Sequence, residues 1–439
     1  MKTNTVLDAE KNIGIHVFFT PFNGIGGRLR TLPEDFIVKE ISIYPPVKEK
    51  GKFTIADITS VNWETNGLVN ELSNRLHISR KRINFAGTKD KRAKTTQLMS
   101  FYKVPKEDLS KVNIKDVLIE NIYYSDHPVK LGDLRGNSFI VTVRNIDKNT
   151  KKSEIQKIAS YIIKAGGFPN FYGIQRFGVI RPVTHIVGKH MVKGDFEKAA
   201  MSYTAGPMQG EDQEIFTVRK QLEETHDYAQ ALKSYPLSLN FEIAILNKLV
   251  KDQNDFVGAL KELPQNLLTM FVYAYQSYLF NKILSERIQN NLPLNKAITG
   301  DIVLPIRKEV IDNEEITVSK RNIEKINKQV AKKKAVISGL LVGSDSKFSY
   351  GLMGEIERKI VENENIDKRD FIIPEIPFAS SSGSRRSLFA FVKKIEYNLA
   401  KDSLNDEKLE LTLKFDLGKG CYATCLLREF MKSDDIRNY

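Results

Sequence analysis

The chain contains little cysteine and little histidine for its 439 residues. Its two cysteines, Cys421 and Cys425, are four positions apart near the C-terminus, which argues against a disulfide scaffold and against a zinc ribbon. We expect both thiols to be buried and reduced. Among the six histidines only His185 and His190 are close in sequence, and no acid is spaced to complete a ligand set with them. The sequence therefore predicts no metal site.

Long apolar runs are also absent. No run is long enough to span a membrane, and the N-terminal MKTNTVLDAEKN lacks the apolar segment of a signal peptide. There is no lipidation signal and no basic amphipathic helix of the membrane-surface kind. We therefore expect a cytoplasmic protein with no membrane partner.

The common motifs for nucleotide and nucleophile chemistry are missing as well. G-x-x-x-x-G-K-[ST] does not occur, and GIGGRLR at residues 24–30 lacks the glycine spacing of a dinucleotide-binding loop. Neither G-x-S-x-G nor a cysteine next to a base motif is found. Carboxylate chemistry remains, because an ionised Asp is a covalent nucleophile that needs no cofactor.

Positive charge is what the chain has in excess. Lys and Arg outnumber Asp and Glu by 67 to 54, a net charge of +13, and the excess is clustered. This pattern is typical of proteins that bind a polyanion, with nucleic acid as the leading candidate. One cluster, residues 320–334, holds seven basic residues and one Glu. We interpret it as a solvated helix face, in preference to a specific RNA contact.

The second cluster, residues 80–94, surrounds one carboxylate with seven basic residues. Lys89, Lys91 and Arg92 are the sequence neighbours of Asp90 and favour its charged form. Gly87 begins a tight turn that would hold a short side chain rigid and exposed. A charged run on a loop is most often only a solvated surface, so this cluster alone does not establish a site.

The pattern of periodicity changes along the chain, which has the length of about two to three domains. Residues 1–150 alternate strand-like runs with one helix at 66–77. Helices follow at 154–165, 195–203, 228–233 and 267–287, the first ended by Gly166 and Gly167. After a linker-like SSSGSRR at 380–386, strand patterns return. Strand-rich ends around a helical middle predict one domain inserted into another.

Six segments, in order, resemble the TruD family of tRNA pseudouridine synthases. They span nearly the whole chain: LPEDFIVKE (32–40), FAGTKDKRAKTTQ (85–97), LRGNSFIVTVRN (134–145), GGFPNFYGIQRFG (166–178), AYQSYLFNKILSERI (274–288) and GCYATCLLRE (420–429). The resemblance implies an α+β fold. A pseudouridine synthase catalytic domain, with a mixed or antiparallel sheet and flanking helices, would be interrupted by a helix-rich α/β TRUD insertion domain. The implied boundaries are 1–166 and 391–439 for the catalytic domain and 167–390 for the insertion, which is long as in archaeal and eukaryotic members.

The resemblance also implies the roles of individual residues. Asp90 matches the catalytic nucleophile. The residues that match substrate-binding positions are Phe36, Asn137, Phe139, Tyr422 and Arg30, the last as a charge partner of Asp90. Phe36 and Phe139 are also explained as ordinary buried strand residues, since Phe139 alternates with Val141 and Val143. Gln175 and Arg176 match the start of the insertion, where a structural role at the domain junction is the preferred interpretation.

The function implied is the isomerisation of uridine to pseudouridine in tRNA, typically at position 13, without metal or cofactor. The partner is tRNA or another structured RNA, and we favour a monomer. The uridine must leave its stack to reach Asp90, with the insertion as the expected clamp. One alternative is a tRNA-binding or chaperone protein that kept the fold without activity. A tRNA methyltransferase is disfavoured by the missing Gly-rich cofactor loop.

Overall fold

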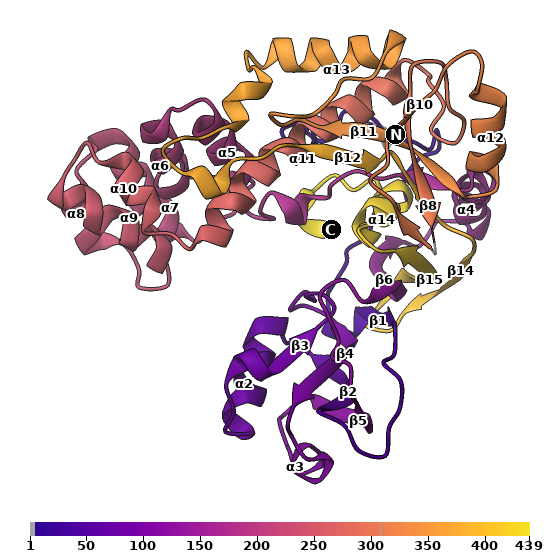
Figure 1. Cartoon of the computed structure of the whole chain (residues 1–439), viewed down its shortest axis with the longest axis horizontal. Coiled ribbons are helices and arrows are strands. Elements are labelled where there is room, and N and C mark those ends of the chain that lie inside the picture. Colours follow the sequence, from indigo (N-terminus) through magenta and orange to yellow (C-terminus); the bar gives the residue numbers. More distant parts are fainter. Residues whose placement is uncertain (1–4, 308) are drawn as a thin grey trace.

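The computed structural model describes residues 5–307 and 309–439, and its largest element is one mixed sheet of eight strands (Figure 1). The strand order is β14-β15-β6-β1-β4-β2-β5, with β3 paired to β4. In this sheet β1 and β4 run parallel, and the other pairs of the described strands are antiparallel. The strands are β1 (Phe36–Ser42), β2 (Phe53–Val61), β3 (Ile83–Phe85), β4 (Lys94–Tyr102), β5 (Val117–Ser125), β6 (Leu134–Asp147), β14 (Ile395–Asp402) and β15 (Asn405–Gly418). The expected mixed sheet is confirmed.

Both ends of the chain build this sheet. Strand β6 pairs with β15 from Lys408↔Asp147 to Gly418↔Gly136, so segments more than 250 positions apart lie side by side. In β15 the buried side chains alternate with exposed ones, as KLELTLKFDL predicts. Helix α1 (Asp8–Lys11) lies near the N-terminus and α14 (Ala423–Met431) near the C-terminus. Helix α2 (Thr65–Arg75) connects β2 to β3, and α3 (Lys106–Ser110) connects β4 to β5.

Helix α4 (Lys152–Ala165) shows how sequence pattern becomes packing. Its Ile155, Ile158 and Ile162 are buried at helical spacing in the same core as α14 and β14. The helix ends at Gly166, whose φ of +87° is a left-handed conformation that glycine adopts without steric cost. The predicted helix with its glycine stop is therefore confirmed.

Two short strands mark where the chain leaves and rejoins the large sheet. β7 (Gly167–Pro169) pairs antiparallel with β13 (Phe389–Phe391), with Gly167 opposite Phe391. The two ends of the segment between them therefore lie next to each other. An inserted domain requires this arrangement, because the host chain must continue from the point at which it was interrupted.

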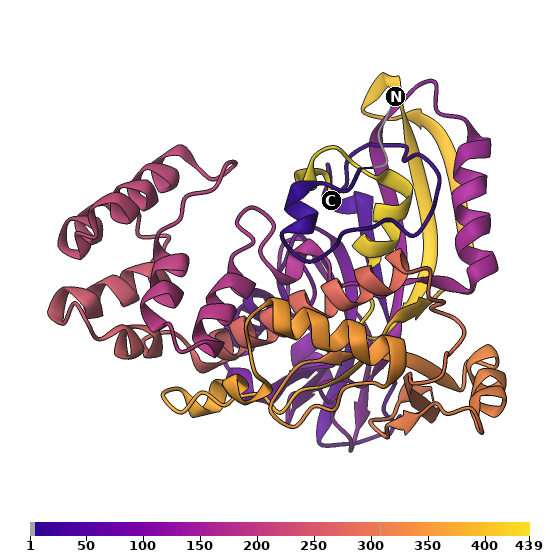
Figure 2. The same cartoon turned by 90° about the horizontal axis from the view of Figure 1, so that it is seen from above.

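The segment between β7 and β13 is rich in helices and carries a second, antiparallel sheet. Helices α6 to α10 form a lobe on the left in Figures 1 and 2, and α11 runs from that lobe to the second sheet. Its sheet has the order β10-β8-β11-β12, with β9 paired to β8. Its helices are α5 (Thr184–Val192), α6 (Phe196–Thr204), α7 (Gln213–Thr225), α8 (Tyr228–Ser234), α9 (Asn240–Lys251), α10 (Phe256–Lys261), α11 (Gln265–Gln289), α12 (Ile323–Ala331) and α13 (Gly351–Asn363). Its strands are β8 (Ile302–Arg307), β9 (Val310–Ile311), β10 (Ile316–Thr317), β11 (Ala335–Leu341) and β12 (Ser384–Ser387).

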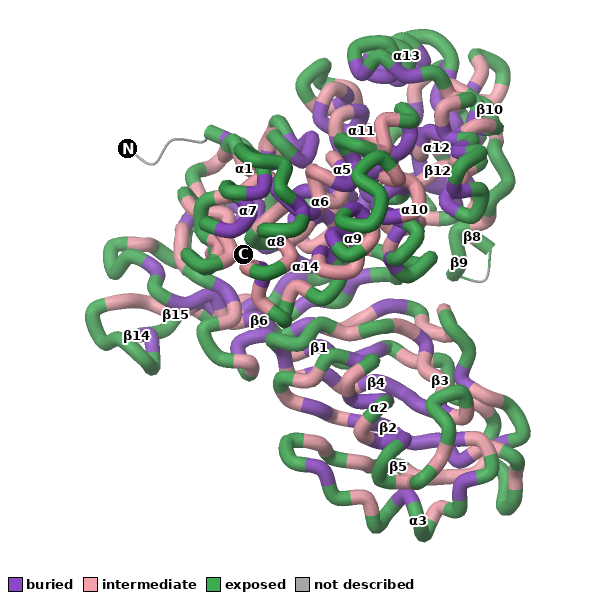
Figure 3. The backbone as a smooth tube through the Cα atoms, turned by 90° about the vertical axis from the view of Figure 1, so that its left-hand side faces the viewer, coloured by how far each residue is buried: buried purple, intermediate pink, exposed green. Residues whose placement is uncertain are grey.

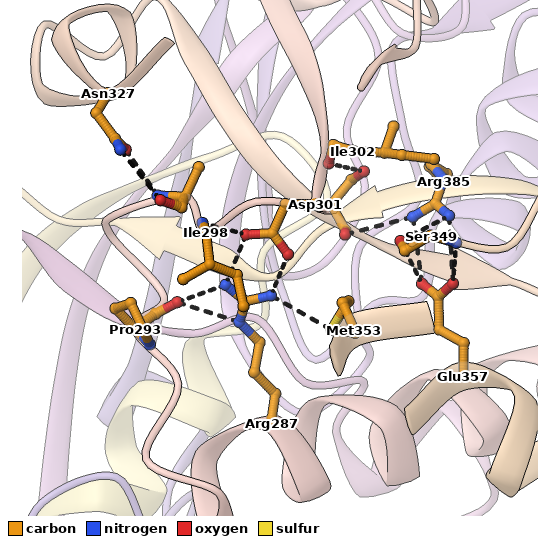
Figure 4. A network of polar contacts seen from close by, with 12 residues as sticks. Arg287, Pro293, Ile298, Asp301, Ile302, Asn327, Ser349, Met353, Glu357 and Arg385 are labelled. Atoms are coloured by element: carbon orange, nitrogen blue, oxygen red, sulfur yellow. Dashed lines mark hydrogen bonds and ion pairs between the residues drawn. The ribbon is translucent and has the colours of Figure 1, made fainter. Parts of the chain in front are cut away.

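The linker predicted at residues 380–386 is wrong in its second half. Residues 384–387 form β12, which pairs with β11. The side chain of Arg385 is 1% exposed, and its Nη1 lies 3.3 Å from Oε1 of the buried Glu357 (Figure 4). A buried carboxylate from α13 thus compensates the charge that composition assigns to solvent.

A second buried ion pair joins α11 to β8. Arg287 donates from Nη1 and Nη2 to the two carboxylate oxygens of Asp301, at 2.6 and 2.9 Å, and both side chains are 0% exposed (Figure 4). The guanidinium also donates to the carbonyl oxygen of Pro293. These contacts satisfy both charges, as burial of an ion pair requires.

The apolar core is continuous between the two sheets. One cluster of buried residues includes Val141 and Leu413 of the large sheet together with Val303 and Ile337 of the second sheet. Figure 3 shows buried residues, coloured purple, in both regions. The inserted segment is thus joined to the large sheet by core packing as well as by β7 and β13. Among the residues described, no helix has both the length and the apolar character needed to cross a bilayer.

Gly188 allows the close approach of α5 and α11, and its replacement is expected to destabilise the fold. A Cβ atom at this position would overlap the backbone carbonyl oxygen of Phe271 on α11, so the two helices would have to move apart. We expect Gly188→Ala to cost about 1–3 kcal/mol of unfolding free energy through overpacking. Gly67→Ala is the matched control, because an added Cβ there would lie 3.7 Å from Glu64 Oε2, which is ordinary van der Waals contact. There Ala should stabilise α2 by roughly 0.5–1 kcal/mol. Urea titration of both variants measures the change in unfolding free energy. If both substitutions changed it by the same amount in the same direction, the interpretation would be contradicted.

His185 is expected to make stability depend on pH. Burial lowers the pKa of its imidazole from 6.5 to about 4, and the ring stacks on Tyr278 at 5.1 Å. The unfolded chain therefore binds the proton more tightly, so the free energy of unfolding decreases as pH falls from 6.5 towards 4. We expect His185→Phe to reduce the fall in Tm between pH 7 and pH 5 by several degrees. The exposed His127 is the control, and His127→Phe should leave the pH profile unchanged. Parallel Tm profiles for wild type and His185→Phe would contradict the assignment.

Candidate active site

Asp90 lies on the turn that joins β3 to β4. The turn is anchored at two points before Asp90: Lys89 N donates to Thr65 Oγ1 at 2.7 Å, and Gly132 N donates to Ala86 O at 2.7 Å. The Asp90 side chain is 61% exposed. The turn thus holds a short carboxylate in a fixed place while leaving it accessible.

The carboxylate borders a pocket of about 230 Å³. This pocket brings together all six site residues expected from the sequence: Arg30, Phe36, Asp90, Asn137, Phe139 and Tyr422. Strand β1 lies between β6 and β4 and brings their residues together: its Val38 is opposite Phe139 of β6, and its Ile37 is opposite Lys94 of β4. Asp90 is on the turn that leads into β4. The volume is below the roughly 300–1,000 Å³ of pockets for drug-sized ligands, so it suits a single small ring.

Arg30 faces the carboxylate directly. Its Nη2 donates to Asp90 Oδ2 at 2.9 Å, and its guanidinium carbon lies 4.4 Å from the centre of the Phe36 ring. The backbone at Arg30 has φ +57°, an unusual conformation for a residue with a Cβ. Stacking on Phe36 and bonding to Asp90 together fix the direction of one carboxylate oxygen.

Lys89, the sequence neighbour of Asp90, pairs with a different acid. Its Nζ lies 2.7 Å from Glu40 Oε2 on β1, and both side chains are buried. Lys91 and Arg92 are exposed beside Asp90. The basic residues of the turn therefore have separate tasks, since Lys89 ties the turn to the sheet. Sequence adjacency could not show this, because Glu40 is 49 positions away.

The aromatic residues are both core and pocket. Phe36 and Phe139 are 3% and 6% exposed, and their rings meet edge to face with centres 6.2 Å apart. Phe139 also stacks on Phe415 of β15 at 5.4 Å. Both sequence interpretations thus describe the same residues: each is packed in the core and each lines the pocket.

The C-terminal wall of the pocket is held by the inserted segment. Arg386 of β12 donates from Nη2 to Gly420 O at 2.8 Å and to Asn170 Oδ1 at 2.9 Å. Its guanidinium lies 4.1 Å over the ring of Tyr172, which meets Tyr422 edge to face. Burial raises the pKa of the Tyr422 hydroxyl, so this side chain is a neutral pocket wall at pH 7.

Both cysteines are free thiols: Cys421 lines the pocket and is partly exposed, whereas Cys425 is buried. Burial raises the pKa of both, that of Cys425 to about 12. A thiol of such high pKa is a poor nucleophile at neutral pH. Within the described ranges, no three His, Cys, Asp or Glu side chains gather as metal ligands do.

The pocket also contains Gln175 and Thr424, which sequence reasoning did not place there. Thr424 Oγ1 donates to Gln175 Oε1 at 3.0 Å. Three buried polar atoms of pocket residues have no partner: Arg30 Nε, Asn137 Oδ1 and Gln175 Nε2. Buried polar atoms rarely lack hydrogen bonds, so these three groups are available to water or to a polar ligand in the pocket.

An accessible carboxylate, a pocket for one ring and a basic surround are the parts of a site for a nucleic-acid base. Known proteins agree with this class. The family model described as tRNA pseudouridine synthase D (TruD) matches residues 12–430. The chain is 43% identical over 440 residues to a probable tRNA pseudouridine synthase D of Methanococcoides burtonii, covering 99% of each chain. It is 37% identical to a protein of that name from Archaeoglobus fulgidus, covering 97% of this chain and 99% of the relative.

Solved structures lead to the same family. The crystal structure of a putative TruD from Methanosarcina mazei superposes with a TM-score of 0.87 at 40% identity, covering 99% of this chain and 100% of the other. The chain belongs to the TruD family of tRNA pseudouridine synthases. The resemblance of the six sequence segments is thereby confirmed.

Proposed function

We propose that this protein isomerises uridine to pseudouridine in tRNA, at position 13, with Asp90 as the nucleophile. The observation that supports this best is the pocket itself. Asp90 borders it together with the five expected substrate-binding residues, and Arg30 aims one oxygen of the carboxylate. Family membership supplies the reaction and the class of RNA.

The reaction needs no other reactant. The bond between ribose C1′ and uracil N1 breaks with the assistance of Asp90, the base turns in the pocket, and C1′ bonds to C5. C5 then releases a proton and N1 gains one, so atoms and electrons balance without an oxidant or reductant. Neither a metal nor a cofactor is required in this scheme, in which the protein supplies position and charge.

The surroundings of Asp90 fit an extruded base. Phe139 and Phe36 offer aromatic surface, and stacking of a base on such a side chain is worth about 1–3 kcal/mol. Lys91 and Arg92 are exposed beside the carboxylate and would neutralise RNA phosphates that approach it.

We further propose the domain boundaries 1–166, 167–390 and 391–439. The pairing of Gly167 with Phe391 supports them, because it brings the two crossing points together. The insertion would enclose the RNA with the catalytic domain. Helix α12 is one basic surface for this, since its Ile326 and Val330 are buried while its lysines remain at the surface.

The direct test uses a tRNA transcript labelled with tritium at uridine C5, without added metal or cofactor. Wild-type protein should release tritium, and the release should vanish when uridine 13 is replaced by cytidine. Release that persists with this replacement would contradict the position, and no release despite tight tRNA binding would favour a non-catalytic tRNA-binding protein.

A further inference from the structure

Gln175 presents an unused hydrogen-bond donor to the pocket. It lies on a single 3₁₀ turn, Ile174–Arg176, just after β7. Its Oε1 accepts from Thr424 Oγ1, while its buried Nε2 has no partner. With Oε1 accepting from Thr424, the two hydrogens of Nε2 meet no protein acceptor and are free for a ligand.

The surroundings of Gln175 keep its amide in place. A Cβ atom at Gly173 would lie 2.8 Å from Gln175 Oε1 and 3.0 Å from Thr424 Oγ1, so this glycine makes room for the contact. The neighbouring Arg176 donates to Ser277 Oγ at 3.3 Å on α11. The 3₁₀ turn is thus tied both to α14 and to the long helix of the inserted segment.

Asn137 supplies the complementary group. Its Oδ1 is buried, accepts no hydrogen bond and belongs to a residue of the same pocket. One free donor and one free acceptor match the edge of uracil, where a carbonyl oxygen lies next to N3–H. Cytosine has the opposite pattern at the same edge, with an amino group and an unprotonated N3.

We propose that Gln175 is a uracil-binding residue that selects the substrate base. Its Nε2 donates to one of the two carbonyl oxygens that flank N3, while Asn137 Oδ1 accepts from N3–H. This inference rests on the proposed function, and it adds a residue of the inserted segment to the base-binding pocket.

The geometry of the reaction suits these two contacts. When the base turns about its N3–C6 axis, N1 and C5 exchange places, and so do O2 and O4. N3–H stays on the axis, and a carbonyl oxygen again occupies the place beside it. The same donor and acceptor are therefore satisfied by the uracil before and after the turn, and no group of the protein has to move.

The test is a double-mutant cycle between protein and substrate. Wild type and Gln175→Leu react under single-turnover conditions with tRNA transcripts that carry uridine, 2-thiouridine or 4-thiouridine at the target position. Nucleoside analysis measures the product. Sulfur is a weak acceptor, so one of the two thio substitutions should slow wild type by about 10-fold or more. Gln175→Leu should lose about 100-fold on uridine, and the same thio substitution should slow it further by less than about 3-fold.

Two further variants separate binding from folding. Gln175→Glu keeps the oxygen that bonds Thr424 but replaces the donor, so it should lose activity even if the Leu variant fails to fold. Gln276→Leu removes a buried glutamine of α11 that donates to Val342 O and Ser381 Oγ outside the pocket. It should lower Tm and leave the thio effects at the wild-type level.

The outcomes distinguish this inference from the proposed function. An active wild type with thio effects that are equal in wild type and Gln175→Leu would overturn the role of Gln175 alone. Wild type that forms no pseudouridine on any transcript would overturn the proposed function, and this inference with it.

Discussion

The Asp90→Asn variant is expected to lose pseudouridine formation by about 10⁴-fold or more. The amide has nearly the shape of the carboxylate, so the turn and its anchors at Thr65 and Ala86 should remain. A neutral amide is not a nucleophile of comparable strength, and it removes the ion pair with Arg30. Release of tritium from C5-labelled tRNA measures the loss, and filter binding checks that the RNA is still bound.

The matched control for this variant is Asp126→Asn, an exposed aspartate after β5 that does not belong to the pocket. Its tritium release should equal that of wild type. Residual activity of Asp90→Asn within about 10-fold of wild type would show that another group performs the nucleophilic step.

The Arg287→Met variant is expected to cost about 3–5 kcal/mol of unfolding free energy. Methionine fills much of the same volume but leaves Asp301 buried without its partner, and Asp301 is 0% exposed. The carbonyl of Pro293 would lose its donor as well. The effect should appear as a large fall in Tm and in the urea midpoint.

Arg307→Met is the control for charge removal alone. Arg307 pairs with Asp312 at 2.8 Å but is 62% exposed, and such surface pairs contribute about 0–1 kcal/mol. The prediction fails if the two variants lose similar stability, since burial of the pair would then have no measurable consequence.

Much of the fold was predictable because periodicity reports burial directly. The alternation in β15 and the helical spacing of Ile155, Ile158 and Ile162 both follow from one buried face. The helix expected at 267–287 is α11, Gln265–Gln289. Composition failed at residues 384–387, where serine and arginine suggest solvent but a buried Glu357 accepts the charge of Arg385.

The site was only partly predictable, because its contacts depend on register between distant strands. The motif around Asp90 indicates a functional turn, but Glu40, the partner of Lys89, lies on another strand. The sequence favours a structural role for Gln175 at the start of the insertion, and Gln175 follows β7, where the chain leaves the large sheet. Its second role emerges only when Thr424, 249 positions later, is seen to hold its amide. A segment can belong to a junction and to a pocket when the pocket is at the junction.

The pairing of β6 with β15 has a consequence for biosynthesis. At about 5–20 residues per second, the residues between Asp147 and Lys408 take roughly 15 to 50 s to leave the ribosome. During that time β6 can pair with β1 on one side, but its other edge has no partner. The inserted segment has time to fold first, with its own buried cluster around α11. The large sheet is therefore completed last, when β15 pairs with β6. We expect the unpaired edge of β6 to be the place where a chaperone protects the growing chain.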